Sequence, residues 1–257
     1  MSNTILHKAA SRGHADHGWL NSYQSFSFAS YYNPERTQFG VLRVLNDDVV
    51  TGGKGFGSHP HDNMEIISIP LEGALVHEDN MGHKEVVSAG EIQVMSTGSG
   101  VFHSEYNNSP DKPAKFLQIW LFPNKLNVTP RYDQVKLDPL KGENRLQQLI
   151  APRGVAGDEA AGEVVGEKGI GEGTWIYQDA WFFSGRFDKE RQISYERKKK
   201  ENGVYLFVIK GSFAVDGQRL DTRDGLGVTD LDSIGIQSLE EGSEILIMDV
   251  PMKNKIQ

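Results

Sequence analysis

The stretch from residue 53 to residue 105 carries two pairs of metal-binding side chains. His59 and His61 form the first pair, and His103 and Glu105 form the second. Because side chains two residues apart on a β-strand point to the same face, the members of each pair aim together. If the two strands are neighbours, three imidazoles and one carboxylate converge on one point. That ligand set suits a divalent first-row transition metal, and an octahedral ion would keep two positions open for water, substrate or dioxygen.

The alternative for each pair taken alone is a surface or pocket position without metal. A lone His-x-His pair on a strand is more often such a pair than a metal site. Here a second pair follows in the same chain, and glycines surround both, among them Gly53, Gly57, Gly98 and Gly100. The combined pattern therefore predicts a metal centre.

The composition favours one fold class and argues against several other functions. The 28 glycines and the many short apolar runs favour an all-β chain with tight turns. A formal net charge of −8 argues against nucleic-acid binding as the main purpose, because phosphate contacts need clustered Lys and Arg. With no cysteine in the chain, any metal must be held by His and carboxylate.

No hydrophobic leader and no apolar run of about 18 residues is present, so we expect a soluble cytoplasmic protein that does not enter membranes. We also expect a monomer, and a protein partner remains open.

The second half of the chain repeats the first. Residues 208–215 match residues 69–76, and residues 245–251 match residues 117–123. With Gly211 set on Gly73, His59 and His61 fall on Arg197 and Lys199, and no histidine follows His103. We therefore predict two small β-barrels in tandem. Residues 1–130 form the metal-binding domain, and residues 131–257 form a second domain without metal ligands.

Several local predictions follow the same patterns. Residues 39–45 are expected to form a strand that turns at residues 46–48, and residues 116–123 a strand that is apolar on both faces. Residues 151–173 are expected to form a long loop. The run at residues 197–200 is basic, and a solvated hairpin tip is favoured over a nucleic-acid or partner patch. His77 and His83 lie beside turns and are expected to be solvated or pocket-lining, not ligands.

Two segments resemble the motifs of a known superfamily. Gly53, His59, His61 and Glu65 stand in a pattern that is similar to the first cupin motif. Residues 90–105 resemble the second motif in the form found in the pirin family, and residues 12–13, 18–20 and 26–32 resemble the N-terminal signature of that family. The resemblance implies a bicupin, an all-β protein with two cupin-type jelly-roll barrels and a metal in the first.

The resemblance also implies a ligand set. Carried over by matching motif, the ligands are His59, His61, His103 and Glu105, while Glu65 lies near them without binding the metal. It favours Fe(II), although the same ligands accept Mn, Co, Ni, Cu or Zn. Eukaryotic pirins act as nuclear, iron-dependent transcription cofactors, so a nuclear location stays open for a eukaryotic source.

Bacterial pirins resemble quercetin 2,3-dioxygenases, and this likeness implies a small aromatic, flavonol-type substrate cleaved with O2, with release of carbon monoxide. Glu105, or Glu65 if it is free, would then accept the hydroxyl proton of the substrate. A pocket lined by Phe56, Met64, Met95 and Phe102 would suit such a flat aromatic substrate, although the default position for apolar residues beside ligands is the hydrophobic core.

Two alternatives remain at this point. One is a metal- or redox-sensing regulatory protein without a dedicated substrate. The other is a different cupin activity such as sugar isomerisation, which would need polar groups around the metal, and the sequence suggests few of them.

Overall fold

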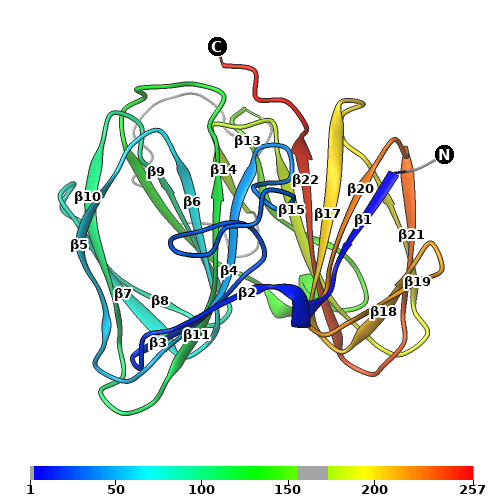
Figure 1. Ribbon diagram of the computed structural model, residues 1–257, viewed down its shortest axis with the longest axis horizontal. Helices are drawn as coiled ribbons and strands as arrows, with labels where there is room; N and C mark the ends of the chain where they lie inside the picture. Colours follow the sequence, from blue (N-terminus) through cyan, green and yellow to red (C-terminus); the bar gives the residue numbers. More distant parts are fainter. Residues whose placement is uncertain (1–2, 155–172, 257) are drawn as a thin grey trace.

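Two β-barrels stand side by side, each built from a seven-stranded and a four-stranded sheet (Figure 1). The structure is a computed structural model that describes residues 3–154 and 173–256. The N-terminal barrel has a large sheet in the order β12-β9-β6-β11-β4-β3-β2 and a small sheet in the order β5-β10-β7-β8. The C-terminal barrel has a large sheet in the order β1-β20-β17-β22-β15-β13-β14 and a small sheet in the order β16-β21-β18-β19. The predicted all-β bicupin architecture is confirmed.

The strands of the N-terminal barrel are β2 (Gly13–Asp16), β3 (Leu20–Gln24), β4 (Leu42–Val50), β5 (Gly55–His61), β6 (Glu65–Glu72), β7 (Ala74–Asp79), β8 (Lys84–Ser88), β9 (Glu91–Ser96), β10 (Val101–Asn107), β11 (Ala114–Leu121) and β12 (Arg131–Lys136). Those of the C-terminal barrel are β1 (Asn3–His7), β13 (Gln147–Pro152), β14 (Thr174–Ile176), β15 (Trp181–Phe187), β16 (Gln192–Glu196), β17 (Asn202–Lys210), β18 (Ser212–Val215), β19 (Gln218–Asp221), β20 (Gly225–Thr229), β21 (Ser233–Ser238) and β22 (Ser243–Pro251). Two short 3-10 helices occur at Ala9–Ser11 and Pro139–Gly142. No helix in these described ranges is long and apolar enough to cross a membrane.

The internal repeat is visible in the strand orders, which correspond one to one. β6, β11 and β4 hold the places in the first large sheet that β17, β22 and β15 hold in the second. Two strands pair with the barrel that lies on the other side of the predicted domain boundary between residues 130 and 131. β12 follows that boundary but pairs with β9, and β1 pairs with β20 of the C-terminal sheet. β1 thereby occupies the edge position that β12 occupies in the other barrel.

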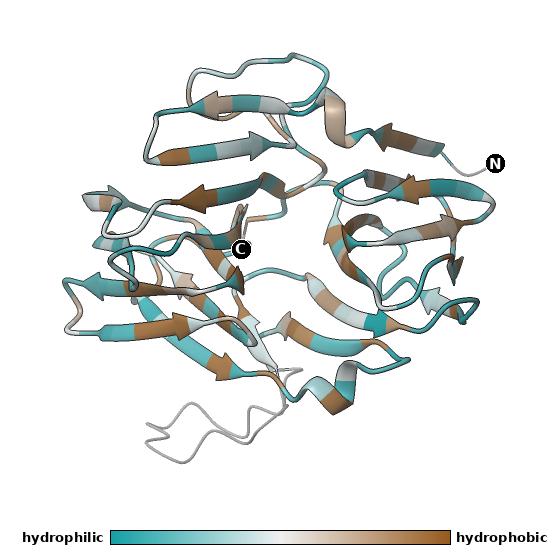
Figure 2. Ribbon diagram, turned by 90° about the horizontal axis from the view of Figure 1, so that it is seen from below, coloured by the Kyte–Doolittle hydropathy of each residue, from teal (hydrophilic) through white to brown (hydrophobic). Residues whose placement is uncertain are grey.

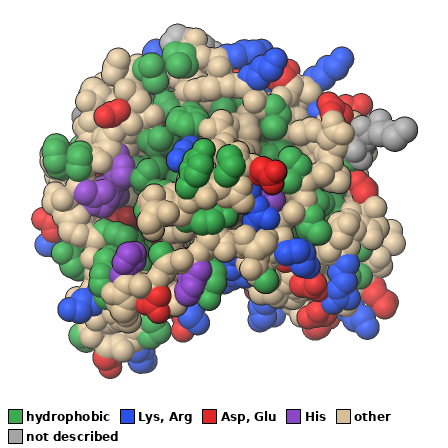
Figure 3. All heavy atoms as spheres, viewed as in Figure 1, with side chains coloured by type: hydrophobic (Ala, Val, Ile, Leu, Met, Phe, Trp, Pro, Cys, Tyr) green, Lys and Arg blue, Asp and Glu red, His purple; other side chains and the backbone are tan. Residues whose placement is uncertain are grey.

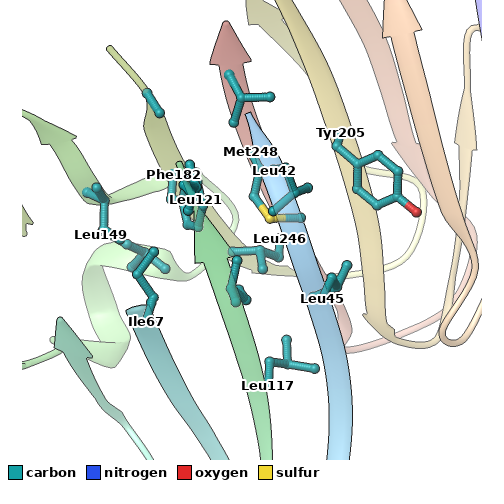
Figure 4. Packing of buried hydrophobic residues seen from close by; sticks show 14 of the residues in the cluster. Leu42, Leu45, Ile67, Leu117, Leu121, Leu149, Phe182, Tyr205, Leu246 and Met248 are labelled. Carbon is teal, nitrogen blue, oxygen red and sulfur yellow. The ribbon is translucent and has the colours of Figure 1, made fainter. Parts of the chain in front are cut away.

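The outer faces of the two large sheets pack on each other and form the main hydrophobic core. Side chains from β4, β6 and β11 meet side chains from β13, β15, β17 and β22 there (Figure 4). On β11, Leu117, Ile119 and Leu121 face this core, while Phe116 lies in a separate cluster on the inner side. The predicted strand is confirmed as β11, which ends at Leu121, but its inner face is not wholly apolar, because Gln118 lies there between Phe116 and Trp120.

A second core fills the inside of the C-terminal barrel. Its members include Phe187, Leu206, Phe213 and Ile247, all fully buried. Hydrophobic and hydrophilic residues follow one another along the strands of both barrels (Figure 2). The basic run forms the connection between β16 and β17, with Arg197 paired to Asp232 and Lys199 paired to Asp179. Most of the predicted loop at residues 151–173 lies outside the described residues, although β13 extends to Pro152.

The predicted turn at residues 46–48 is wrong. β4 continues from Leu42 to Val50, and these three polar residues lie inside it and are buried. Asn46 and Asp48 face the inside of the N-terminal barrel, whereas Asp47 faces the other side. Three consecutive polar residues look like a turn in the sequence, but the backbone of these residues pairs with β3 on one side and with β11 on the other, so the strand continues.

Asp47 links segments that are far apart in the sequence. One of its oxygens, Oδ2, lies 3.2 Å from Nη1 of Arg12 and 2.9 Å from Nε of Arg223, which follows β19 in the C-terminal barrel. The Arg12 and Asp47 side chains are 6% and 12% exposed, so solvent screens this contact little.

We expect Asp47→Asn to lower the free energy of unfolding by about 2 kcal/mol, because two neighbouring guanidinium groups lose their shared counter-charge. Glu78→Gln serves as the control, since Glu78 pairs with Lys84 on the surface and such pairs contribute about 0–1 kcal/mol. Urea denaturation of the three proteins measures the difference. Equal losses in the two variants would contradict a stabilising role for the Asp47 contact.

Candidate metal centre

The small sheet of the N-terminal barrel carries both pairs of predicted ligands. His59 and His61 lie on β5, and His103 and Glu105 lie on β10. These strands are neighbours, with His103 directly opposite His59 in the antiparallel register. The register shifts between His103 and Glu105, so the carboxylate lies opposite Phe56. The β10 pair is buried, while the β5 pair is partly exposed.

Three imidazoles form a compact cluster. The ring centroids of His59, His61 and His103 are 4.8, 4.5 and 5.0 Å apart, and one nitrogen from each lies within 4.8 Å of the other two. Most of the histidine side chains visible in Figure 3 lie over the half of the molecule that this barrel forms. The backbone pairing of β5 with β10 therefore brings the nitrogens to distances that one metal ion can span.

The protonation of these rings fits metal binding. Nδ1 of His59 donates to the carbonyl of Gly57 at 2.7 Å, so Nε2 is the ring nitrogen that remains for a metal. Burial, followed by the charge of His59, lowers the pKa of His61 to about 4. Burial also lowers the pKa of His103 to about 2, and the charges of His59, His61 and His77 add to this effect. Nε2 of His103 is buried and has no partner among the described residues. The lowered pKa values keep the rings of His61 and His103 neutral near pH 7, and a neutral ring with an unused lone pair is what a divalent metal requires.

Glu105 spans the barrel and contacts the large sheet. Oε1 accepts a hydrogen bond from Ser68 Oγ at 3.2 Å, and Oε2 accepts one from Gln118 Nε2 at 2.9 Å. Burial raises the pKa of Glu105 to about 7, and these two hydrogen bonds partly offset the shift. Glu105 lies in a second group with His103 and His77, whose ligand atoms are also within 4.8 Å of one another. Each carboxylate oxygen keeps a second lone pair, so metal coordination needs neither hydrogen bond to break.

The cluster opens onto a cavity of about 550 Å³. Its walls include His59, His61 and Glu105 together with four aromatic side chains, Trp19, Phe28, Phe56 and Trp120. Of the predicted pocket residues, only Phe56 lines this cavity. Met64 and Met95 pack in an apolar cluster with Trp120, and Phe102 is exposed on the outer face of β10. A volume of this size is typical of small-molecule sites.

A row of polar side chains crosses the inner face of the large sheet below the histidines. Six residues on adjacent strands are direct cross-strand partners, one after another: Gln24, Asn46, Gln118, Ser68, Gln93 and Gln134. The corresponding row of the C-terminal barrel reads Gln148, Phe183, Ile247, Leu206, Leu226 and Leu6. The same fold thus encloses a polar site in one barrel and a hydrophobic core in the other. The expectation of few polar groups near the metal is wrong.

Comparison with known proteins identifies the family. Residues 6–121 match the family model described as Pirin, and residues 164–250 match the one described as the quercetinase C-terminal cupin domain. The quercetin 2,3-dioxygenase of Escherichia coli strain K12 is 40% identical over 246 residues, which cover 96% of this chain and 98% of that protein. A pirin-like protein of Caulobacter vibrioides is 36% identical over 91% of this chain and 94% of its own length. The chain belongs to the pirin family.

A solved structure of a family member is also similar in three dimensions. The bacterial pirin of Escherichia coli in complex with nickel(II) superposes with a TM-score of 0.86 at 38% identity, over 97% of this chain and 99% of that one. The resemblance drawn from the sequence motifs is therefore confirmed over nearly the whole length of this pirin.

Glu65 does not lie beside the predicted ligands. It faces away from the barrel interior, where it accepts a hydrogen bond from Ser96 Oγ at 2.7 Å. Burial raises the pKa of Glu65 to about 7, while Ser96, a backbone hydrogen bond from Tyr177 and the charge of Arg131 act against this shift. β5 ends at His61 and β6 begins at Glu65 after a turn. Because of this turn, the side chains of β6 do not continue the alternation of β5. The spacing between His61 and Glu65 in the sequence therefore does not place the two side chains on the same face.

His77 is fully buried, although the sequence suggested a solvated or pocket-lining position. It lies on β7 directly opposite Glu105, and its Nδ1 is 3.5 Å from Nδ1 of His103 and 3.2 Å from Nε2 of Gln93. Nε2 of His77 lies 3.0 Å from Asp79, which also contacts His83. The neighbouring turn is close in sequence, but the pairing of β7 with β10 directs His77 inward.

We expect Ni(II) to raise the unfolding midpoint of the wild-type protein and to have no such effect on His103→Ala, which removes the most buried nitrogen of the cluster. Free metal at 100 times its dissociation constant adds about 2.7 kcal/mol to the free energy of unfolding. His14→Ala is the control, because His14 is exposed and stacks on Tyr23. Thermal unfolding with and without Ni(II) gives the measurement. A metal-dependent rise that survives in His103→Ala would place the binding elsewhere.

Proposed function

We propose that this pirin is a metal-dependent dioxygenase that cleaves flavonol-type substrates with O2. The observation that carries the proposal is the position of the histidine cluster in the wall of a cavity large enough for a small aromatic molecule. A structural zinc site is closed and tetrahedral, without access for a ligand. The activity named for the Escherichia coli relative supports the same reaction.

The proposed centre holds one metal ion through His59, His61, His103 and Glu105. Fe(II) is our proposal from the family resemblance, since these donors accept several first-row metals. When bound, the metal would act as a Lewis acid that stabilises the deprotonated oxygen of the substrate and holds the substrate beside O2.

The side chains of this pirin supply proton transfer and positioning. We propose Glu105 as the acceptor of the substrate hydroxyl proton, because its carboxylate lines the cavity beside His59 and His61. Ser68 and Gln118 hold this carboxylate from the opposite sheet. Trp19 and Phe56 pack edge to face, with ring centroids 5.2 Å apart, and form an apolar wall suited to a flat aromatic ring. Glu65 has no part in this scheme, because it faces away from the cavity.

The polar row would also suit sugar isomerisation, but the aromatic cavity walls and the activity named for the Escherichia coli relative favour a flavonol substrate. The regulatory alternative predicts bound metal without turnover. A monomeric state and a cytoplasmic location remain predictions.

We expect wild-type protein, purified without a metal-binding tag and loaded with Fe(II), to consume quercetin and O2 and to release carbon monoxide. His61→Ala should lower this rate by about 100-fold or more, because loss of even a residue that only orients a metal ligand commonly costs about 10- to 100-fold in metal affinity or activity. His14→Ala should retain the wild-type rate. Loss of quercetin absorbance and carbon monoxide release are the two measurements.

Stoichiometric metal with no turnover under any loaded ion would contradict the dioxygenase proposal and favour the regulatory alternative.

A further inference from the structure

We propose that Gln24, Asn46 and Asp48 form a second recognition site in the same cavity, which binds hydrogen-bond donors of a polyhydroxylated aromatic substrate. The inference deepens the proposed function and rests on it. It assigns the substrate at least one free hydroxyl group apart from the oxygens that would bind the metal.

The first observation is a set of unpaired atoms. Oε1 of Gln24, Oδ1 of Asn46 and Oδ1 of Asp48 are buried and have no hydrogen-bond partner among the described residues. All three residues line the cavity, and each is at most 3% exposed. Buried polar atoms in folded proteins nearly always have partners, and leaving one unpaired costs free energy. Three unpaired atoms in one cavity wall therefore point to an occupant that supplies donors.

The second observation is their arrangement. Gln24 and Asn46 are direct partners across β3 and β4, and Ser22 and Asp48 are the next facing pair along the same two strands. The three side chains thus share one patch of the inner face, on rigid paired strands. Gln118, which holds Glu105, is the cross-strand neighbour of Asn46 on the other side. The patch therefore adjoins Gln118, which holds the proposed ligand Glu105, and one substrate can contact both the patch and the metal centre.

The third observation concerns charge. Among the described residues that line the cavity, none is Lys or Arg, while Asp48 and Glu105 are both acidic. Apart from the proposed metal ion, a phosphate or carboxylate ligand would meet no cationic side chain in this lining, and it would face two carboxyl groups. Phenolic hydroxyl groups, in contrast, are neutral donors that suit amide and carboxyl oxygens. The lining thus selects a polyphenol over an organic acid or a sugar phosphate.

The test compares two probes on holoprotein loaded with Fe(II), without O2, at pH 8. 3-Hydroxyflavone carries only the chelating hydroxyl and ketone, whereas quercetin carries four additional hydroxyl groups. We expect the wild type to bind quercetin more tightly. Asn46→Leu and Asp48→Leu should each reduce the ratio of quercetin affinity to 3-hydroxyflavone affinity by about tenfold. This is the effect expected from the loss of one hydrogen bond, neutral for Asn46 and charge-assisted for Asp48. The affinity for 3-hydroxyflavone should change little.

Gln134→Leu is the matched control. Gln134 is at the other end of the same polar row and does not line the cavity, so the variant should keep the wild-type preference. Urea denaturation of the metal-free proteins gives a second readout. Removal of an unpaired buried oxygen should leave Asn46→Leu at least as stable as Gln134→Leu, which loses hydrogen bonds to the Val86 carbonyl and to Glu91.

Two results would overturn the inference: a wild type without preference for quercetin, or a preference unchanged in both cavity variants, which would mean that these atoms contact only water. If one variant does not fold, the other decides. These outcomes are separate from failure of the proposed function, which is judged by turnover and carbon monoxide release in the wild type.

Discussion

The packing of the two large sheets against each other is the constraint on which the rest of the structure depends. Leu117, Ile119 and Leu121 of β11 meet Leu246 and Met248 of β22 in this shared core. Because this face and the filled C-terminal barrel supply most of the buried apolar surface, the inside of the N-terminal barrel need not be a hydrophobic core. It can contain polar groups and a cavity, which would be costly in a barrel that had to stabilise itself.

Because side chains alternate along a strand, a single strand can contribute to the hydrophobic core with one face and to the cavity with the other. On β11, Leu117, Ile119 and Leu121 stabilise the core between the barrels, while Gln118 and Trp120 on the other face help to form the site. On β4, Asp47 ties the barrels together, and its neighbours Asn46 and Asp48 line the cavity. A shift of one residue in register would exchange these faces, so the site and the fold depend on the same pairing.

Glu105 connects the two sheets of the N-terminal barrel. It lies on the small sheet beside the histidines, but its hydrogen-bond donors, Ser68 and Gln118, belong to the large sheet. The position of the carboxylate relative to the cluster is therefore set by the distance between the sheets. In the C-terminal barrel the positions of Ser68 and Gln118 are taken by Leu206 and Ile247, and no histidine follows His103, so this barrel lacks both the candidate ligands and their polar support.

The sequence by itself determined the all-β class, the repeat, the barrel that bears the histidines and the two pairs of candidate ligands, because a period of two and a matched repeat are local properties of the chain. Only the tertiary structure decided the faces of Glu65 and His77, the course of β4 through residues 46–48 and the polar row. Each of these depends on which strands become neighbours and on where a turn resets the alternation. Those are contacts between distant segments, and no short stretch of sequence encodes them.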